Sequence, residues 1–569
     1  MSFYEESSIV ITPNAYKAGT LYAINPASGL ADMDVTRATA ATRVDESGLV
    51  NYAEVIGDSI LTGNNSTFDT GIGSWVTYNG GTLAHSTDKL EVTLTSGESG
   101  ARINTNSLIS GGQSGKTFKV RARIWKGTST NSTIAIFIGG AQKFITISPT
   151  PTYFEAELTA ANTSMLTIYR AGGGGGVGTY FIDDVTVKEV TRDNVPRIDY
   201  TGGGCPHILS EPQRTNKVTY SEDFTQWTNT DITFGSDGVS PSGQTNANLI
   251  QTGTAGSDQV SKIFTLSATN TTTYSVFIKR VSGAEWVDFL IVKSGFSNSL
   301  KVWFNINTGS VGSNNQTGTT TLDNASIESF GNNWYKLNVT TTDTTNNTSF
   351  NIRVRTASAD SSDTRVNDSS YYLWGMQLEK DSYATSYIPT SGATVTRNQD
   401  QFSRDGISSL INSTEGVLFA EIAALANDGT NRIISLSDGT TTNRVSLILS
   451  TTTNTIRAMA VSGSTTFDED HAVTSVLDYN KIALKYKVND FALWINGVEV
   501  DTDNSGDTPT GLDRIVFDVG NGSLFPFFGK VKQLQVYPTA LTDEQLIELT
   551  GVTYSSYLAM ANALNYTIQ

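Results

Sequence analysis

The chain has 569 residues with 38 Lys and Arg against 55 Asp and Glu, a net charge of −17, and only 16% of its residues are charged. This acidic balance argues against a nucleic-acid-binding groove, whose affinity would depend on clustered basic residues. One cysteine, Cys205, excludes an intrachain disulfide framework. No apolar run approaches the ~20 residues that span a bilayer, so no membrane insertion is expected, and the N-terminal segment lacks the pattern of a signal peptide.

Alternating apolar and polar residues recur along the chain and predict antiparallel strands with one wet face. In residues 117–125 the apolar side chains of Phe118, Val120, Ala122 and Ile124 share one face. The same pattern is found at 90–94, 334–339, 350–354 and 482–486. Asn496-Gly497 between two apolar segments predicts a tight hairpin. Thr542-Asp543-Glu544-Gln545 is a capping-box pattern that predicts a short helix, and a second helix is a candidate over 555–566.

An internal repeat indicates two related jelly-roll sandwiches. In each copy a Phe and a Trp precede the strands, at 65–75 and at 220–227, and an aromatic-led strand closes the copy, at 179–190 and at 371–380. We therefore expect the domains in the following order. They are an N-terminal β module at 1–57 that continues at 191–216, an inserted jelly roll at 58–190, a second jelly roll at 217–394, a third sandwich at 395–551 and a C-terminal tail at 552–569.

Four segments resemble bacteriophage virion proteins, particularly tail and fibre components. They are ATRVDESGLV at 41–50, NVPRIDYTGGGCPHILSEPQRTN at 194–216, YSEDFTQW at 220–227 and GMQLEKDSYATSYIPTSGATVTRNQD at 375–400. The third sandwich resembles concanavalin A-like (laminin-G-like) domains on WINGV at 494–498 and on the segment 529–546, and the two jelly rolls resemble carbohydrate-binding modules. The fold class expected from repeat and resemblance is all-β, with several β-sandwiches in tandem and a short helix near the C-terminus.

The resemblance implies a non-enzymatic virion structural protein, a tail-fibre or surface-fibre component whose sandwiches bind host-surface glycans. Its partners would be other virion proteins, a host glycan and further copies of the chain, with a trimer favoured by the resemblance. Such a protein would be made in the host cytoplasm without a signal peptide and would reside on the tail or the capsid surface. The alternatives are a capsid decoration or head-fibre protein with an assembly role only and, less favoured, a polysaccharide depolymerase.

Exposed aromatic rings that can stack on sugars, next to polar or charged groups, are the candidates for glycan binding. Trp125 lies on the polar side of its alternating strand next to Arg123, and Trp286 and Trp303 are weaker candidates. Trp374 is in phase with Tyr372, Met376 and Leu378 and is expected in the core.

Acidic residues provide the remaining candidates. Asp501, Asp503 and Asp507 lie close together in the sequence and could form a structural Ca²⁺ site, although the stretch is also typical of a turn. Asp183 and Asp184 could in principle act as a hydrolytic pair. Adjacent residues on a strand point to opposite faces, so these two carboxylates are not expected to converge.

Overall fold

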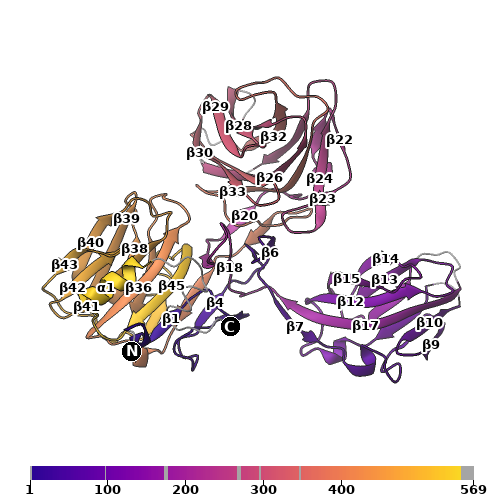
Figure 1. Cartoon of the computed structure of the whole chain (residues 1–569), viewed down its shortest axis with the longest axis horizontal. Helices are drawn as coiled ribbons and strands as arrows, with labels where there is room; N and C mark the ends of the chain where they lie inside the picture. The colour runs from indigo at the N-terminus through magenta and orange to yellow at the C-terminus, as the bar shows by residue number, and fades with distance from the viewer. Residues whose placement is uncertain are drawn as a thin grey trace. The chain divides into compact units, whose positions relative to one another are not determined.

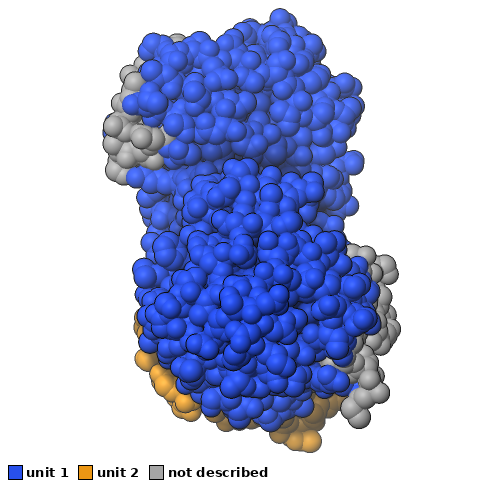
Figure 2. Space-filling view, turned by 90° about the vertical axis from the view of Figure 1, so that its left-hand side faces the viewer, with its two compact units in different colours: residues 1–53, 193–569 blue, residues 54–192 orange. Residues whose placement is uncertain are grey.

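The computed structural model describes residues 3–95, 98–171, 177–265, 271–293, 297–344 and 348–552. The glycine run at 172–176 and the tail from residue 553 onward, including the helix expected over 555–566, lie outside this range. The described chain is all-β, as the alternation predicts, with antiparallel sheets and the α-helix α1 (Asp543–Gly551) (Figure 1). It divides into a unit formed by Glu54–Arg192 and a larger unit formed by Met1–Ala53 with Asp193–Gln569 (Figure 2).

The unit Glu54–Arg192, here called the first roll, is a sandwich of two antiparallel sheets, and the expected insertion at 58–190 falls within it. One sheet has the strand order β15-β12-β17-β10-β9, with β7 also paired to β17, and the other has the order β14-β13-β16-β11-β8. Alternate residues turn inward to a shared core that includes Phe68, Trp75 and Tyr180. The strands are β7 (Val55–Ser59), β8 (Val76–Tyr78), β9 (Thr82–His85), β10 (Leu90–Leu94), β11 (Gly100–Ile103), β12 (Thr117–Lys126), β13 (Thr133–Ile138), β14 (Ala141–Thr146), β15 (Thr152–Thr159), β16 (Leu166–Arg170) and β17 (Gly178–Thr191).

The second roll comprises β21 to β33 of the larger unit and has the same architecture. Its sheets have the orders β22-β24-β33-β26-β31-β30, with β23 paired to β24, and β21-β25-β32-β27-β28-β29. Its core includes Phe224, Trp227 and Met376. Trp374 is buried as expected, at 1% exposed, but it packs with Tyr372 and Tyr387 in a separate cluster and not with Met376 and Leu378, because the register of β33 shifts between them. The strands are β21 (Thr228–Thr230), β22 (Ile232–Phe234), β23 (Gly238–Val239), β24 (Thr245–Thr252), β25 (Gln259–Thr265), β26 (Thr271–Ser282), β27 (Trp286–Lys293), β28 (Asn298–Asn305), β29 (Ser310–Thr317), β30 (Thr320–Ser329), β31 (Trp334–Asp343), β32 (Ser349–Ala357) and β33 (Ser370–Lys380).

The strand orders of the two rolls correspond one to one. β9-β10-β17-β12-β15 matches β22-β24-β33-β26-β31, and β8-β11-β16-β13-β14 matches β21-β25-β32-β27-β28. The second roll adds β29 and β30, one to each sheet. This shared order agrees with the internal repeat seen in the sequence.

A third sandwich, here called the C-terminal sandwich, contains strands from the beginning, middle and end of the chain. One sheet has the order β18-β19-β45-β36-β41-β42-β43 with β1 paired to β45, and the other the order β2-β3-β4-β35-β44-β37-β38-β39-β40. Its strands are β1 (Ile9–Ile11), β2 (Tyr16–Lys17), β3 (Thr20–Leu21), β4 (Met33–Thr36), β18 (Ile198–Asp199), β19 (His207–Ser210), β35 (Gln401–Arg404), β36 (Glu415–Ala424), β37 (Arg432–Ser437), β38 (Asn443–Leu449), β39 (Thr455–Ser462), β40 (Ser464–Ala472), β41 (Asn480–Lys487), β42 (Phe491–Ile495), β43 (Val498–Asp503), β44 (Arg514–Val516) and β45 (Gly529–Tyr537).

These pairings correct the expected separate module at 1–57 and 191–216. Its strands are too short to enclose a core of their own, and β1 to β4, β18 and β19 instead extend the two sheets of the C-terminal sandwich. Two small ladders lie outside these sheets, β5 (Thr42–Val44) with β6 (Val50–Tyr52) and β20 (Arg214–Asn216) with β34 (Val395–Arg397).

Two local predictions in the C-terminal sandwich are confirmed. Asn496 and Gly497 connect β42 to β43 with φ angles of 50° and 86°, as a tight primed turn requires. The capping box is formed, because the Thr542 hydroxyl accepts a hydrogen bond from the Gln545 backbone and the Gln545 side chain accepts one from the Thr542 backbone. α1 then packs Leu546 and Leu549 into a small cluster on the outside of the sheet that contains β36 and β41.

Candidate functional site

A groove of about 560 Å³ lies on the outward face of the sheet β21-β25-β32-β27-β28-β29 in the second roll. Its lining residues alternate along the strands with residues of the core, so the strands that build the core also form the groove. Polar and charged side chains dominate the lining. The lining residues are Thr230, Gly256, Ser257, Asp258, Gln259, Leu290, Ser299, Lys301, Asn315, Thr317, Arg355, Asp363 and Arg365.

One row of residues crosses four strands of this sheet. Arg353 of β32 lies opposite Leu290 of β27, Leu290 opposite Lys301 of β28, and Lys301 opposite Asn315 of β29. Directly opposed residues on antiparallel strands point to the same face of the sheet. The register therefore places an ammonium group and a side-chain amide next to each other on the groove side.

Buried carboxylates hold the arginines of the groove in place. Asp288 is 0% exposed, and its two oxygens lie 2.8 Å from Arg355 and 2.6 Å from Arg365. Asp258 accepts hydrogen bonds from the backbone and hydroxyl of Thr356, both at 2.8 Å. Burial nevertheless raises the pKa of Asp258. Charges fixed in this way lose little conformational freedom when a ligand binds.

The groove's lysine is held from both sides. Lys301 donates to the Asp363 carboxylate, and this hydrogen bond lowers the pKa of Asp363. The Lys301 Nζ atom also lies 5.0 Å from the centroid of the Trp303 ring. The Lys301 side chain is 14% exposed and that of Asp363 is 69% exposed, so the pair lies where a ligand could reach it.

Two sequence-predicted tryptophans lie on this sheet, but neither offers an open ring. Trp303 is 2% exposed, and its indole nitrogen donates to the Ser362 carbonyl at 2.9 Å. Trp303 therefore fixes the loop after β32, and its prediction as an exposed sugar platform is wrong. Trp286 is half-buried, and Gly312 faces its ring closely enough that a Cβ at this glycine would lie 2.6 Å from it. Trp286 packs at the end of β27 beside the strand that carries Asn315.

Trp125 and Arg123 lie on the outward side of the first roll's sheet with β12 and β17. Trp125 is half-buried, its ring centroid is 5.3 Å from that of Phe181, and the Arg123 guanidinium is 5.6 Å from its ring. Tyr153, 44% exposed, lies opposite Arg123 on β15. The alternation that placed Trp125 on the polar side is confirmed, and its contact with sugar stays a prediction.

Asp183 and Asp184 lie on the same side of the sheet as Trp125, in contrast to the expectation. Asp183 is opposite Arg123 with 3.5 Å between the charged groups, and Asp184 accepts a hydrogen bond from the Tyr153 hydroxyl at 2.5 Å. The reason is a bulge, because the register shifts here and Asp184 has a φ of 47°. Each carboxylate is engaged by a different neighbour.

The expected calcium site is not formed by Asp501, Asp503 and Asp507. Asp503 accepts hydrogen bonds from the backbone and hydroxyl of Ser505, and Asp501 lies 3.8 Å from His471. Within the described ranges no three carboxylate, histidine or cysteine side chains are placed to hold a metal ion. Asp501 and Asp503 belong to the strand β43, and only Asp507 lies in the loop after it, so the turn expected over the whole stretch is not formed either.

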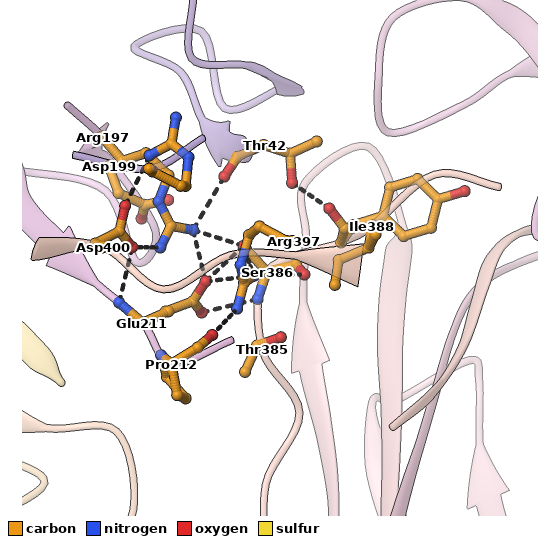
Figure 3. Close-up of polar contacts among 12 residues, drawn as sticks. Thr42, Arg197, Asp199, Glu211, Pro212, Thr385, Ser386, Ile388, Arg397 and Asp400 are labelled. Carbon is orange, nitrogen blue, oxygen red and sulfur yellow. Dashed lines mark hydrogen bonds and ion pairs between the residues drawn. The ribbon is translucent and has the colours of Figure 1, made fainter. Parts of the chain in front are cut away.

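A network of buried charges joins distant segments of the larger unit (Figure 3). Glu211 lies 2.5 Å from Arg197 and 2.7 Å from Arg397, while Asp400 contacts Arg197 and lies 2.7 Å from Arg37. All five side chains are at most 4% exposed. The network lies between the chain leaving the second roll and the strands of the C-terminal sandwich.

The network remains charged in spite of its burial. Burial opposes the charge on Arg197, but Asp400 and Glu211 outweigh it and raise the pKa of this arginine. Burial likewise opposes ionisation of Glu211, but Arg397 and Arg197 bring its pKa below the usual range. Removing one partner from such a cluster leaves a buried charge uncompensated, which is strongly destabilising.

The four segments behind the phage resemblance lie at or next to this network. The second and fourth segments supply the charged side chains Arg197, Glu211, Arg397 and Asp400. The first supplies the carbonyl oxygen of Thr42, which accepts a hydrogen bond from Arg197 at 3.4 Å. The third segment joins the fourth through side-chain hydrogen bonds. The Tyr387 hydroxyl donates to the Glu222 carboxylate and is also hydrogen-bonded to the Ser221 hydroxyl.

Sequence reasoning missed most of the groove residues. Lys301 was recognisable as the polar neighbour of Trp303 in an alternating strand, but Asp258, Arg355 and Asp363 lie in segments with no common motif. The pairing of β25, β32, β27 and β28 brings these segments together.

No protein-family model matches the chain, and no curated protein matches it. Among solved structures, it is similar to the CBM40 of the Ruminococcus gnavus IT-sialidase bound to α2,3-sialyllactose, at 19% identity over 25% of this chain and 86% of that chain, with a TM-score of 0.23. It is also similar to domain 4 of AbnA, a GH43 extracellular arabinanase from Geobacillus stearothermophilus, in complex with arabinotriose, at 18% identity over 30% and 83% of the two chains and a TM-score of 0.23. The NanB sialidase of Streptococcus pneumoniae matches at 14% identity over 27% and 26%, with a TM-score of 0.23. Similarity this low does not distinguish one β-sandwich function from another. No helix among the described residues is long and apolar enough to cross a membrane.

Proposed function

We propose that the chain is a glycan-binding protein and that the groove of the second roll is a binding site. The observation that carries this proposal is the groove itself, about 560 Å³ lined by amide, hydroxyl and paired charged side chains. Sugars present many hydroxyl groups, each of which can both donate and accept hydrogen bonds. A lining of this kind satisfies such a ligand better than it satisfies an apolar one.

The proposed activity is binding without catalysis. Hydrolysis of a glycosidic bond ordinarily uses two carboxyl groups that act on the substrate. The two buried carboxylates of the groove, Asp288 and Asp258, already hold partners on both of their oxygens. Incubating the pure protein with a bound polysaccharide should therefore leave the chain length of that polysaccharide unchanged, measured by size-exclusion chromatography.

The binding test uses paired substitutions on β28 and β29. Lys301→Ala and Asn315→Ala remove an ammonium group and an amide from the groove, and each should weaken binding to surface polysaccharides by about 10-fold. Asn314→Ala is the matched control, because Asn314 neighbours Asn315 and does not line the groove. Affinity is measured by biolayer interferometry on immobilised polysaccharide. If all three variants bound with the affinity of the unmodified chain, the groove would not be the binding site.

We further propose that this binding serves a phage particle, with the chain as a tail-fibre or surface-fibre component that acts as a homo-oligomer. Its support is the resemblance of the four segments and their position at one buried network. Many copies would multiply weak sugar contacts through effective concentration. Immunogold labelling of particles would locate the chain, and a position on the head with no glycan binding would favour the assembly role instead.

A further inference from the structure

A row of aromatic rings crosses the first roll on the sheet β14-β13-β16-β11-β8, which corresponds to the groove sheet of the second roll. Tyr78 of β8 lies opposite Gly100 of β11, and Gly100 lies opposite Tyr169 of β16. Tyr169 lies opposite Ala135 of β13, and Ala135 lies opposite Phe144 of β14. Aromatic and small residues therefore alternate across the sheet, on the face that points away from the core.

The small residues allow the rings to approach one another. Across Gly100 the centroids of Tyr78 and Tyr169 are 5.4 Å apart in an edge-to-face arrangement. A Cβ at Gly100 would lie 2.7 Å from the Tyr169 Cβ and 2.4 Å from the Ile168 carbonyl oxygen, so no larger residue fits there. Ala135 is 0% exposed although it is on the outward face, so its neighbours cover it. The row therefore holds two rings in contact, Tyr78 and Tyr169, and a third, Phe144, on the other side of Ala135.

Polar groups lie along this surface. The Tyr169 hydroxyl donates to the Gln142 side chain at 2.9 Å, and the Arg102 guanidinium lies 5.9 Å from the centre of the Tyr78 ring. Aromatic faces with a few fixed polar groups beside them are the usual composition of a site for a small polar ligand. Burial raises the pKa of Tyr169, so its hydroxyl stays protonated and able to donate at neutral pH.

The size of the row identifies the kind of occupant. Phe144 is 56% exposed and the two tyrosines are half-buried, so the three side chains offer roughly 200 Å² in total. A stable protein interface needs about 800 Å² from each partner. The row is too small for a second copy of the chain and suits a narrow ligand.

Its shape and charge narrow the ligand further. The row crosses five strands, which corresponds to about 19 Å at the usual strand spacing. Within the row itself no residue is charged. Beside it, the Arg102 guanidinium lies 5.9 Å from the Tyr78 ring, and the negative charge of Glu98 contributes to the raised pKa of Tyr169, so charges of both signs lie next to the row. An extended uncharged chain with flat apolar faces fits these features.

We propose that the aromatic row of the first roll binds a neutral oligosaccharide lengthwise, with successive sugar rings over Tyr78, Tyr169 and Phe144. The inference rests on the proposed function for its ligand class and uses none of the groove residues. The two rolls would then hold two separate sites, a charged groove and an uncharged platform. Because the platform is extended, affinity should rise with the length of the oligosaccharide.

The test is isothermal titration of the full chain with neutral gluco-oligosaccharides and N-acetylglucosamine oligomers, from disaccharide to hexasaccharide. Phe144→Ala should weaken binding of the longest oligomers by roughly 3- to 10-fold and leave the disaccharide almost unchanged, since Phe144 lies at one end of the row. Tyr169→Ala, at the centre, should weaken both. Tyr169→Phe retains the ring and should retain the length dependence. Phe525→Ala, which removes another half-exposed phenylalanine from the C-terminal sandwich, is the matched control.

The groove variant Lys301→Ala separates the two sites. If Lys301→Ala abolished oligosaccharide binding while Phe144→Ala and Tyr169→Ala bound as tightly as the unmodified chain, the proposed site on the aromatic row would be wrong. The groove would then be the oligosaccharide site. The absence of oligosaccharide binding by the unmodified chain would also overturn the row, while the groove is judged by its own polysaccharide test. If Phe144→Ala instead dissociated an oligomer in sedimentation velocity, the face would be an interface between copies and the proposal would be wrong.

Discussion

The two rolls share one strand order and differ in the surface that they present. The outward face of the first roll's sheet β14-β13-β16-β11-β8 carries Tyr78, Tyr169 and Phe144 between small residues. The corresponding face of the second roll carries Lys301 and Arg355 over a buried Asp288. Inward-facing residues determine the fold, whereas outward-facing residues on the same strands are free to define different chemistry.

The additional strands of the second roll explain why it has a groove. In the first roll the chain passes from β14 to β15 through the short connection at 147–151. In the second roll β29 and β30 occupy the corresponding place, and β29 brings Asn315 and Thr317 to the groove. The additional strand β29 therefore gives the outward face of this sheet a side wall, which the corresponding face of the first roll lacks.

The rolls also differ in how they are anchored, and the largest expected effect tests this difference. Arg197→Met should lower the free energy of unfolding of the larger unit by about 3–5 kcal/mol, because it leaves Glu211 and Asp400 with one arginine fewer in a buried site. The first roll is a separate unit and should retain its own transition in differential scanning calorimetry.

Arg192→Met is the control within the first roll. Arg192 pairs with Glu54 and Glu157 at a partly exposed site, so its removal should cost about 1 kcal/mol or less. The difference in anchoring would be contradicted if Arg197→Met strongly shifted the unfolding transition of the first roll, or if it left the unfolding transition of the larger unit unchanged.

A second prediction concerns the cores. The core-facing residues Ile134, Ile136 and Ile138 of β13 are all apolar, whereas the corresponding strand β27 ends in Lys293, which is 0% exposed and lies 5.3 Å from the ring of Phe350. Burial lowers the pKa of Lys293 to about 8 from 10.5. Lys293→Ile should therefore raise the free energy of unfolding at pH 7 by up to about 3 kcal/mol.

The sign of the pH dependence follows from the lowered pKa of Lys293. Below about pH 8 the lysine is charged in both states and the full cost of burying it is present. Between pH 8 and 10.5 the unfolded chain binds a proton that the folded chain lacks, so the stability of the unmodified protein rises with pH. The advantage of Lys293→Ile should shrink over this range in urea titrations. Lys143→Ile, at an exposed lysine of β14, is the matched control for the same substitution at the surface.

The smallest expected effect concerns Trp125. Trp125→Ala should lower the stability of the first roll by about 1 kcal/mol through the loss of its contacts with Phe181 and Arg123. If Trp125 and Arg123 also contact sugar, glycan binding should fall roughly 3- to 10-fold. Loss of stability with unchanged binding, compared by thermal melting and titration on the same samples, would remove both residues from the glycan sites.

The sequence predicted those features that depend on neighbouring residues. Alternation located the strands and placed Trp125 outward, and local motifs identified the turn at Gly497 and the helix after Thr542. It predicted that Trp374 is buried but not its side of the sheet, because a register shift next to Gly375 separates it from Met376 and Leu378. Aromatic type alone misled at Trp303, because its burial depends on a loop some 60 residues away that folds over it. Contacts made by pairing of distant strands leave no mark in a local pattern.

The groove and the charge network were beyond sequence reasoning for this reason. Arg37 and Asp400 lie 363 residues apart and meet only because β4 pairs with β35. Nothing near Arg37 in the sequence indicates that it is 1% exposed. The bulge at Asp184 is a comparable case, because one left-handed residue reverses the face that simple alternation assigns.

The pairing of β1 with β45 has a consequence for the synthesis of the chain. Ile9, Val10 and Ile11 pair with residues 534–536, so this edge of the C-terminal sandwich cannot close until β45 has been synthesised and has left the ribosome. The rolls pair strands much closer in sequence and can fold earlier. A chain that stopped short of β45 would leave the apolar strand β1 and the neighbouring β19 without their partner. Such an unpaired edge favours aggregation, so the pairing of β45 with β1 and β19 also protects these strands.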